Sequence, residues 1–181
     1  DQQSVINTMF DLYENHGFAI AMSINAEVVM LARADVVYRN ALVNQCNVRF
    51  ADGIGIVKAI KHKQGVSIPR LPGCEIWELL MAEASIRQTS VFLVGASAEV
   101  IKRTQIKLIE QYQTPIVGYQ DGYFDDDLKL IEEIKVSGAK IVTVAMGTPR
   151  QEQFIFKCRD AGINAIFMGV GGTYDVFTGN V

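Results

Sequence analysis

The acidic residue best placed for chemistry is Asp52, in the segment FADGIGIV (50–57). It follows a strand-like run and precedes Gly53 and Gly55, where a helix is expected to begin. Aspartate is common there as a helix N-cap, which is the structural alternative. At the mouth of a cleft the same carboxylate could act as a general base, because burial tunes its pKa.

Two glycine-rich segments could hold a phosphate group. They are LVGASAEV (93–100), with Gly95, and FMGVGGTYD (167–175), with Gly171. Glycine lets the backbone approach a ligand and leaves amides free for phosphate oxygens. Neither segment is a GxGxxG fingerprint, and no GxxxxGK[ST] motif occurs. For each cluster alone, tight-turn geometry and diphosphate binding remain equal alternatives.

Arg70 lies between Pro69 and Pro72, which would stiffen its loop and hold the guanidinium at low entropic cost. Such an arginine is suited to a diphosphate, and the alternative is an ordinary surface residue. Gln151 follows Pro149, so it could start a helix or reach a sugar or phosphate.

Three further clusters have a structural and a functional interpretation. Tyr123 could stack on a base or simply pack against the protein. The run Asp125–Asp127 resembles a metal cluster, but its position favours a solvated first helical turn, and we expect no metal. Lys58, Lys61, His62 and Lys63 form a basic patch on an expected helix, with a solvated face as the first interpretation and attraction to anionic lipid as the second.

The elements that must position these residues alternate along the chain. Strands are predicted at 18–23, 46–50, 90–94, 115–118, 140–146 and 164–168, and helices at 1–15, 35–44, 73–86, 98–112 and 126–136. This pattern predicts a single α/β domain over 1–181, a mostly parallel, Rossmann-like sheet with helices on both faces. The candidate residues follow the strands, so they should meet in one cleft at the carboxyl edge.

Composition excludes several classes of protein. The net charge is 17 − 20 = −3, which argues against a nucleic-acid binder, and no apolar stretch is long enough to span a membrane. Three widely spaced cysteines predict reduced thiols in a cytoplasmic protein. Two histidines exclude a multi-histidine metal site. The polar N-terminus carries no signal peptide and no initiator methionine, so we expect a fragment.

Seven segments in chain order resemble the WecG/TagA/CpsF family of bacterial glycosyltransferases. Seven motifs in register over nearly the whole chain are far more specific than any one glycine cluster. Within the family the resemblance is strongest to the branch that transfers N-acetylmannosaminuronic acid in enterobacterial common antigen synthesis. The segments are SINAE (23–27), FADGIGIV (50–57), PRLPGCEIW (69–77), VFLVGASAEV (91–100), QDGYF (120–124), AMGTPRQE (145–152) and MGVGGTYDVFTG (168–179).

The resemblance implies an inverting transfer, with no metal or other cofactor, from a UDP-sugar to undecaprenyl-diphosphate-linked N-acetylglucosamine. Asp52 matches the proposed catalytic base, and Arg70 matches an arginine thought to contact a diphosphate. The teichoic-acid branch has threonine where this chain has Ser23, so a hydroxyl is retained. The remaining candidate donor- or substrate-binding residues are Asn25, Gly95, Tyr123, Gln151, Gly171 and Asp175.

The resemblance also implies what lies outside this sequence. The family continues past FTG (177–179) with a basic helical appendage whose arginines complete the site and dock on the membrane, and it has a strand before residue 1. We therefore expect 1–181 to be a catalytic core of a protein peripheral to the inner face of the cytoplasmic membrane. Loss of the appendage would expose apolar surface, so self-association is expected.

Three alternatives stay open. A UDP-N-acetylmannosamine donor, as in the teichoic-acid branch, would need no pocket for a carboxylate. A dinucleotide-binding oxidoreductase would fit the α/β pattern but not the fingerprint. A non-catalytic nucleotide-sugar-binding scaffold is the third. Every version of the transferase requires the Asp52 carboxylate to lie beside the glycine turns in an open cleft.

Overall fold

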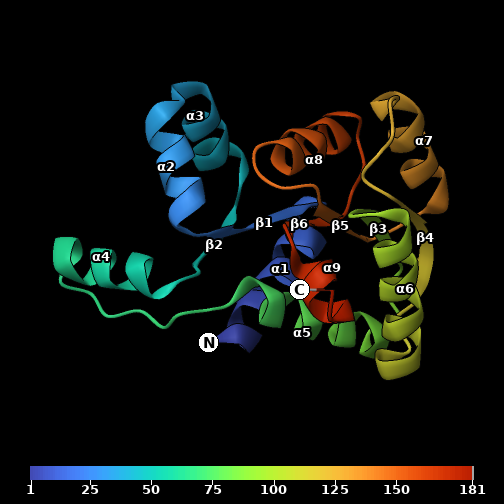
Figure 1. Ribbon diagram of the computed structural model, residues 1–181, viewed down its shortest axis with the longest axis horizontal. Coiled ribbons are helices and arrows are strands. Elements are labelled where there is room, and N and C mark those ends of the chain that lie inside the picture. Colours follow the sequence, from blue (N-terminus) through green and yellow to red (C-terminus); the bar gives the residue numbers. More distant parts are fainter. Residues whose placement is uncertain (181) are drawn as a thin grey trace.

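The computed structural model describes residues 1–180, which form a six-stranded sheet with helices on both faces (Figure 1). Every strand pairing is parallel, and the strand order is β2-β1-β6-β5-β3-β4. The predicted Rossmann-like α/β fold is therefore confirmed. The strands are β1 (Ala19–Ile24), β2 (Val48–Ala51), β3 (Val91–Gly95), β4 (Ile116–Gln120), β5 (Ile141–Ala145) and β6 (Ile166–Gly169).

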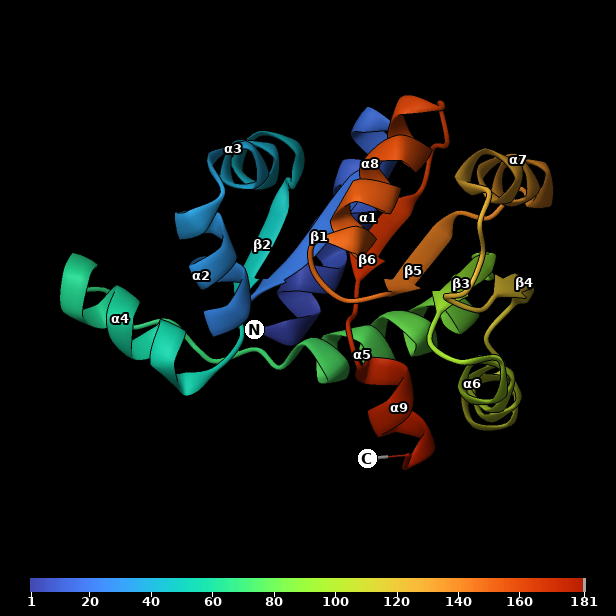
Figure 2. The same cartoon turned by 45° about the horizontal axis from the view of Figure 1, so that its top comes forward.

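The helices divide between the two faces of the sheet, and each set covers its own apolar core (Figure 2). On one face lie α1 (Gln2–His16), α5 (Gly73–Ile86), α6 (Ala98–Tyr112) and α9 (Thr173–Thr178). On the other lie α2 (Ala26–Ala34), α3 (Val36–Gln45), α7 (Asp127–Ser137) and α8 (Arg150–Asp160). The remaining helix, α4 (Ile54–Gln64), has no buried residue.

The central strands are apolar throughout because both of their faces are covered. All residues of β3 and β5 are buried, which matches their almost unbroken apolar sequences. In contrast, β4 forms one edge of the sheet and has a mixed burial pattern.

The first crossover contains one helix more than the sequence predicted. The helix expected over 35–44 is confirmed as α3, but α2 precedes it after β1 and was not predicted. Asn25 caps the N-terminus of α2 through a bond from the Val28 amide, and Asp35 ends α2 and caps α3. The β-branched pair Val28–Val29 weakens the helical signal, and the two caps lie only ten residues apart (35 − 25).

The topology opens a gap at the carboxyl edge of the sheet. The segment after β1 leads to α2 on one face, whereas the segment after the neighbouring β6 leads to α9 on the other. Where successive connections diverge in this way, a ligand can bind beyond the strand ends. Among residues 1–180, no helix combines the length and apolar character needed to cross a bilayer.

Candidate active site

A cleft of about 370 Å³ lies beyond the ends of β1 and β6, where the connections diverge. We call it the β1–β6 cleft. It brings together several residues that were predicted as site residues from far apart in the sequence: Ser23, Asn25, Asp52, Gln151 and Gly171. The backbone of Gly147, Gly169 and Gly172 lines the same cleft.

The Asp52 carboxylate lies at this cleft and is held at one oxygen. Its Oδ2 accepts a hydrogen bond from the backbone amide of Gly73, at 3.0 Å, and its side chain keeps 24% exposure. The structural alternative for Asp52 is wrong, because Gly53 occupies the N-cap of α4 and no side chain caps that helix. Asp52 instead bonds to the first residue of α5, and the carboxylate retains access to solvent.

Arg70 lies beside this carboxylate rather than inside the cleft. Its Nε is 3.8 Å from Asp52 Oδ1, and half of its side chain is exposed. The following residue, Leu71, donates its backbone amide to Ala51 at 2.9 Å, which ties the proline-bracketed loop to the end of β2. An exposed pair at this distance adds little stability, so its interest is the placement of a cation beside Asp52.

Ser23 and Asn25 occupy the end of β1. A Cβ on Gly73 would lie 3.3 Å from the Ser23 Cβ and 3.4 Å from Asp52 Oδ2, so these three residues are tightly packed. Asn25 uses its Oδ1 to accept from the Val28 amide at 2.9 Å. Its side-chain nitrogen has no hydrogen-bond partner among the described residues and is a donor that a ligand can use.

A chain of hydrogen bonds runs behind the cleft, and we call it the Glu152 network. The Tyr38 hydroxyl is 3.2 Å from Thr148 Oγ1, which donates to one Glu152 oxygen at 2.7 Å. The other Glu152 oxygen accepts from Gln151 Nε2 at 2.8 Å, and Gln151 Oε1 accepts from the Gly171 amide at 3.0 Å. Both ends of the Gln151 amide are thus fixed, and Gln151 holds the Gly171 turn.

Glu152 is an unusual residue to find in a protein interior, since it is only 1% exposed. Burial raises the pKa of its carboxyl, while the bonds from Thr148 and Gln151 oppose that rise. Burial likewise raises the pKa of the Tyr38 hydroxyl, to about 12. The Tyr38 hydroxyl therefore keeps its proton at neutral pH.

Sequence reasoning did not select Glu152 as a site residue. A signal existed for its neighbour, because Gln151, Phe154, Ile155 and Cys158 share the i, i+3, i+4, i+7 spacing of a buried helix face, and all four are buried. A polar residue on an apolar stripe requires a partner, and Gln151 finds it in Glu152.

A second cleft, of about 380 Å³, lies beyond β3 and β5, and we call it the β3–β5 cleft. Tyr123, Arg150 and Asp175 line it. Tyr123 is 82% exposed, so the alternative that it packs against the protein is wrong. The expectation of one cleft is corrected here as well, since Tyr123 and Asp175 lie apart from Asp52.

The two clefts adjoin each other. Arg150 lines the second and the next residue, Gln151, lines the first; Asp175 lines the second and the next residue, Val176, lines the first. The start of α8 and the short helix α9 therefore separate them. A ligand long enough to cross this divide could occupy both.

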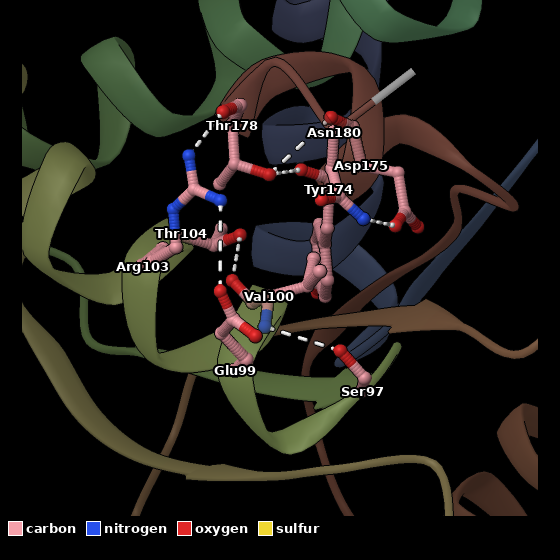
Figure 3. A network of polar contacts seen from close by, with 9 residues as sticks. All are labelled: Ser97, Glu99, Val100, Arg103, Thr104, Tyr174, Asp175, Thr178 and Asn180. Atoms are coloured by element: carbon pink, nitrogen blue, oxygen red, sulfur yellow. Dashed lines mark hydrogen bonds and ion pairs between the residues drawn. The ribbon is translucent and has the colours of Figure 1, made fainter.

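Bonds to α6 hold α9 in this dividing position (Figure 3). Arg103 donates to the Thr178 carbonyl at 2.7 Å, and the Thr178 hydroxyl donates to the Tyr174 carbonyl at 2.8 Å. Asn180 donates to the Asp175 carboxylate at 3.2 Å, which orients the Asp175 side chain.

Gly95 has a structural reason for its identity. Its φ is +112°, and a Cβ there would lie 2.2 Å from the Ala145 carbonyl oxygen at the end of β5. Close approach of two strand ends requires glycine at this position whatever binds nearby. The tight-turn interpretation is sufficient for Gly95, whereas nothing lies within 4 Å of a Cβ at Gly171.

Comparison with known proteins adds a family to this geometry. The family model described as the glycosyl transferase WecG/TagA/CpsF family matches residues 1–181.

Proposed function

Since this chain belongs to the WecG/TagA/CpsF family of glycosyl transferases, we propose that it moves N-acetylmannosaminuronic acid from its UDP donor to undecaprenyl-diphosphate-linked N-acetylglucosamine. The family acts in cell-surface polysaccharide synthesis, with a nucleotide-sugar donor and a lipid-linked acceptor in general. This membership assigns glycosyl transfer rather than the hydride transfer of an oxidoreductase. The finer proposal concerns the two sugars, the stereochemistry and the residue roles.

One observation carries the proposal: the Asp52 carboxylate is oriented by Gly73, remains partly exposed, and shares a cleft with the glycine backbone that follows β5 and β6. The proposal requires the carboxylate to lie beside the glycine turns in an open cleft, and this arrangement supports it. A carboxylate in such a place can take a proton from a bound hydroxyl.

In the proposed reaction, Asp52 takes the proton of the acceptor's 4-hydroxyl while that oxygen attacks the anomeric carbon of the donor. The new bond from carbon to oxygen forms as the bond to the diphosphate breaks, and UDP leaves with the electron pair from the opposite face. An α-linked donor therefore yields a β-linked product. General-base assistance of this kind contributes about 10²–10⁴-fold to a rate.

The leaving diphosphate gains negative charge, which the protein must meet with fixed donors. Candidates in the β1–β6 cleft are the backbone at Gly147 and the turn at 169–172, which Gln151 holds through the Gly171 amide. Arg70 adds a guanidinium beside Asp52. The cleft thus offers phosphate contacts within reach of the proton acceptor.

The nucleoside half of the donor is assigned to the adjoining β3–β5 cleft. Tyr123 presents an exposed ring on which a uracil can stack, and the oriented Asp175 carboxylate can accept from ribose or base. Arg150 lines the same cleft and carries a cationic head. A nucleotide-sugar lying across α9 would place its sugar toward Asp52.

The first test is a fluorescence titration of the protein with UDP and with NADH. The proposal predicts saturable binding of UDP and none of NADH; tight NADH binding without UDP binding would overturn it. The second test offers UDP-N-acetylmannosaminuronic acid and UDP-N-acetylmannosamine together to the intact protein with a synthetic lipid acceptor. Preferential use of the uronate is expected. Preference for the neutral sugar would overturn the donor assignment, and UDP binding without product would indicate a scaffold.

A further inference from the structure

The segment 53–74 has a charge unlike that of the rest of the chain, and we call it the α4 arm. It contains Lys58, Lys61, Lys63 and Arg70 and no aspartate or glutamate, so its formal charge is +4. The whole chain carries −3, so the remainder carries −3 − 4 = −7. Positive charge is therefore concentrated on this arm of an otherwise acidic protein.

The arm is also the least packed part of the fold. None of the residues of α4 is buried, and both ribbon views show the helix projecting past β2, the edge strand, away from the other helices (Figures 1 and 2). Lys58, Lys61 and Lys63 are all exposed, and none forms an ion pair with a carboxylate within residues 1–180.

Apolar side chains accompany these lysines. Ile54, at the start of α4, is 60% exposed, and Val66, just past its end, is 52% exposed. An eleven-residue helix with no side-chain N-cap is marginal in water when it buries nothing. Exposed lysines on a helix with large apolar side chains at both ends suit a lipid surface in which anionic headgroups cover apolar acyl chains.

We propose that the α4 arm docks the protein on an anionic membrane surface. The lysines would lie among the lipid headgroups, and Ile54 and Val66 would enter the boundary with the acyl chains. The two ends of the arm meet at the site, because Asp52 immediately precedes it and bonds to Gly73 near its far end. Docking would therefore hold the mouth of the β1–β6 cleft beside the membrane. The inference rests on charge and packing, and not on the proposed sugar transfer.

The test is cosedimentation of the 181-residue chain with vesicles of phosphatidylcholine, with and without phosphatidylglycerol. Each lysine near an anionic surface contributes about fivefold in affinity, from about 1 kcal/mol. We expect binding that requires phosphatidylglycerol and weakens with added salt. The triple variant Lys58→Gln, Lys61→Gln, Lys63→Gln should bind on the order of 100-fold less tightly.

The matched control is Lys102→Gln, Lys129→Gln, Lys140→Gln, which removes the same charge from exposed lysines elsewhere and should bind like the wild type. Circular dichroism verifies that both variants are folded. The proposal is overturned if wild-type binding does not depend on phosphatidylglycerol, or if the control variant loses as much vesicle affinity as the arm variant. It is also overturned if the arm variant binds vesicles like the wild type and differs only in self-association, as measured by sedimentation without vesicles.

UDP titration separates this proposal from the proposed function. The arm variant should keep wild-type UDP affinity. If the wild type binds UDP normally but does not bind vesicles, this proposal fails and the proposed function stands.

Discussion

Asp52 and Gly73 are joined by a hydrogen bond of 3.0 Å from the Gly73 amide to the Asp52 carboxylate. The bond orients the carboxylate, and the missing side chain at Gly73 leaves it room beside Ser23. Glycine at this position therefore serves the geometry of the cleft.

Gly73→Ala should lower the rate of sugar transfer by about fivefold without unfolding the protein. The new Cβ would lie 3.3 Å from the Ser23 Cβ, so Ser23 and the start of α5 must move apart by a few tenths of an ångström. That shift weakens the bond from the Gly73 amide to Asp52, which is worth about 1 kcal/mol. Alanine is the better helix former, which offsets the crowding in stability. Steady-state rates and thermal melts check both parts. Gly55→Ala, with nothing within 4 Å of its Cβ, is the control, and an equal loss of rate there would contradict the prediction.

The three cysteines provide a chemical probe of the same cleft. Cys46 and Cys158 are buried, and burial raises the pKa of each thiol to about 12, so both should resist alkylation. Cys74 is only half-buried and lines the β1–β6 cleft. Iodoacetamide on the native protein should label Cys74 alone, as read by peptide mass spectrometry, and bound UDP-sugar should slow the labelling. Rapid labelling of Cys46 or Cys158 would show that the packing is wrong.

The buried Glu152 should make stability depend on pH. Burial raises the pKa of its carboxyl above the ordinary 4.5, so the folded chain binds this proton more tightly than the unfolded chain. The contribution of the carboxyl to stability is fully present below about pH 4.5 and is lost as the pH rises through the folded pKa. The free energy of unfolding of the wild type, minus that of Glu152→Gln, should therefore fall with rising pH in urea titrations. A difference that is flat or rises over this window would contradict the burial of Glu152.

Gly95→Ala tests the close approach of β3 and β5. Its Cβ would overlap the Ala145 carbonyl oxygen at 2.2 Å, in addition to strain at a φ of +112°. We expect a loss of about 3 kcal/mol or more in the free energy of unfolding, or no folding at all. Gly138→Ala is the control, because its φ is +67° but nothing lies within 4 Å of its Cβ, so only about 1–2 kcal/mol should be lost. Equal losses in chemical denaturation would assign the effect to φ alone.

The sequence was sufficient to predict the parallel sheet and most of the residues that meet in the β1–β6 cleft. Buried strands such as 141–145 can be recognised in the sequence because both faces of a central strand are apolar. The placement of Asp52, Gln151 and Gly171 in one cleft followed from the rule that carboxyl ends of parallel strands share an edge. That rule gives neither the order of the strands in the sheet nor the position of α9. It therefore predicted one cleft, whereas α9 separates two.

Other features depended on contacts that no local pattern contains. The partner of Asp52 is a backbone amide 21 residues away, so the residue type at position 73 alone could not reveal it. Glu152 was missed because a glutamate in the first turn of a helix is ordinarily a solvated residue that suits the helix dipole. Only the folding of Thr148 and Gln151 around it turns this carboxylate into the centre of a buried network.

The central claim is that the Asp52 carboxylate receives the acceptor's proton, and the most direct measurement is the transfer rate of Asp52→Asn in the intact protein, alongside its UDP affinity. Asparagine can still accept from the Gly73 amide through its oxygen, so the cleft should keep its shape and UDP should bind as in the wild type. The account predicts a rate about 10²–10⁴-fold lower. A variant that transfers sugar at nearly the wild-type rate would contradict it.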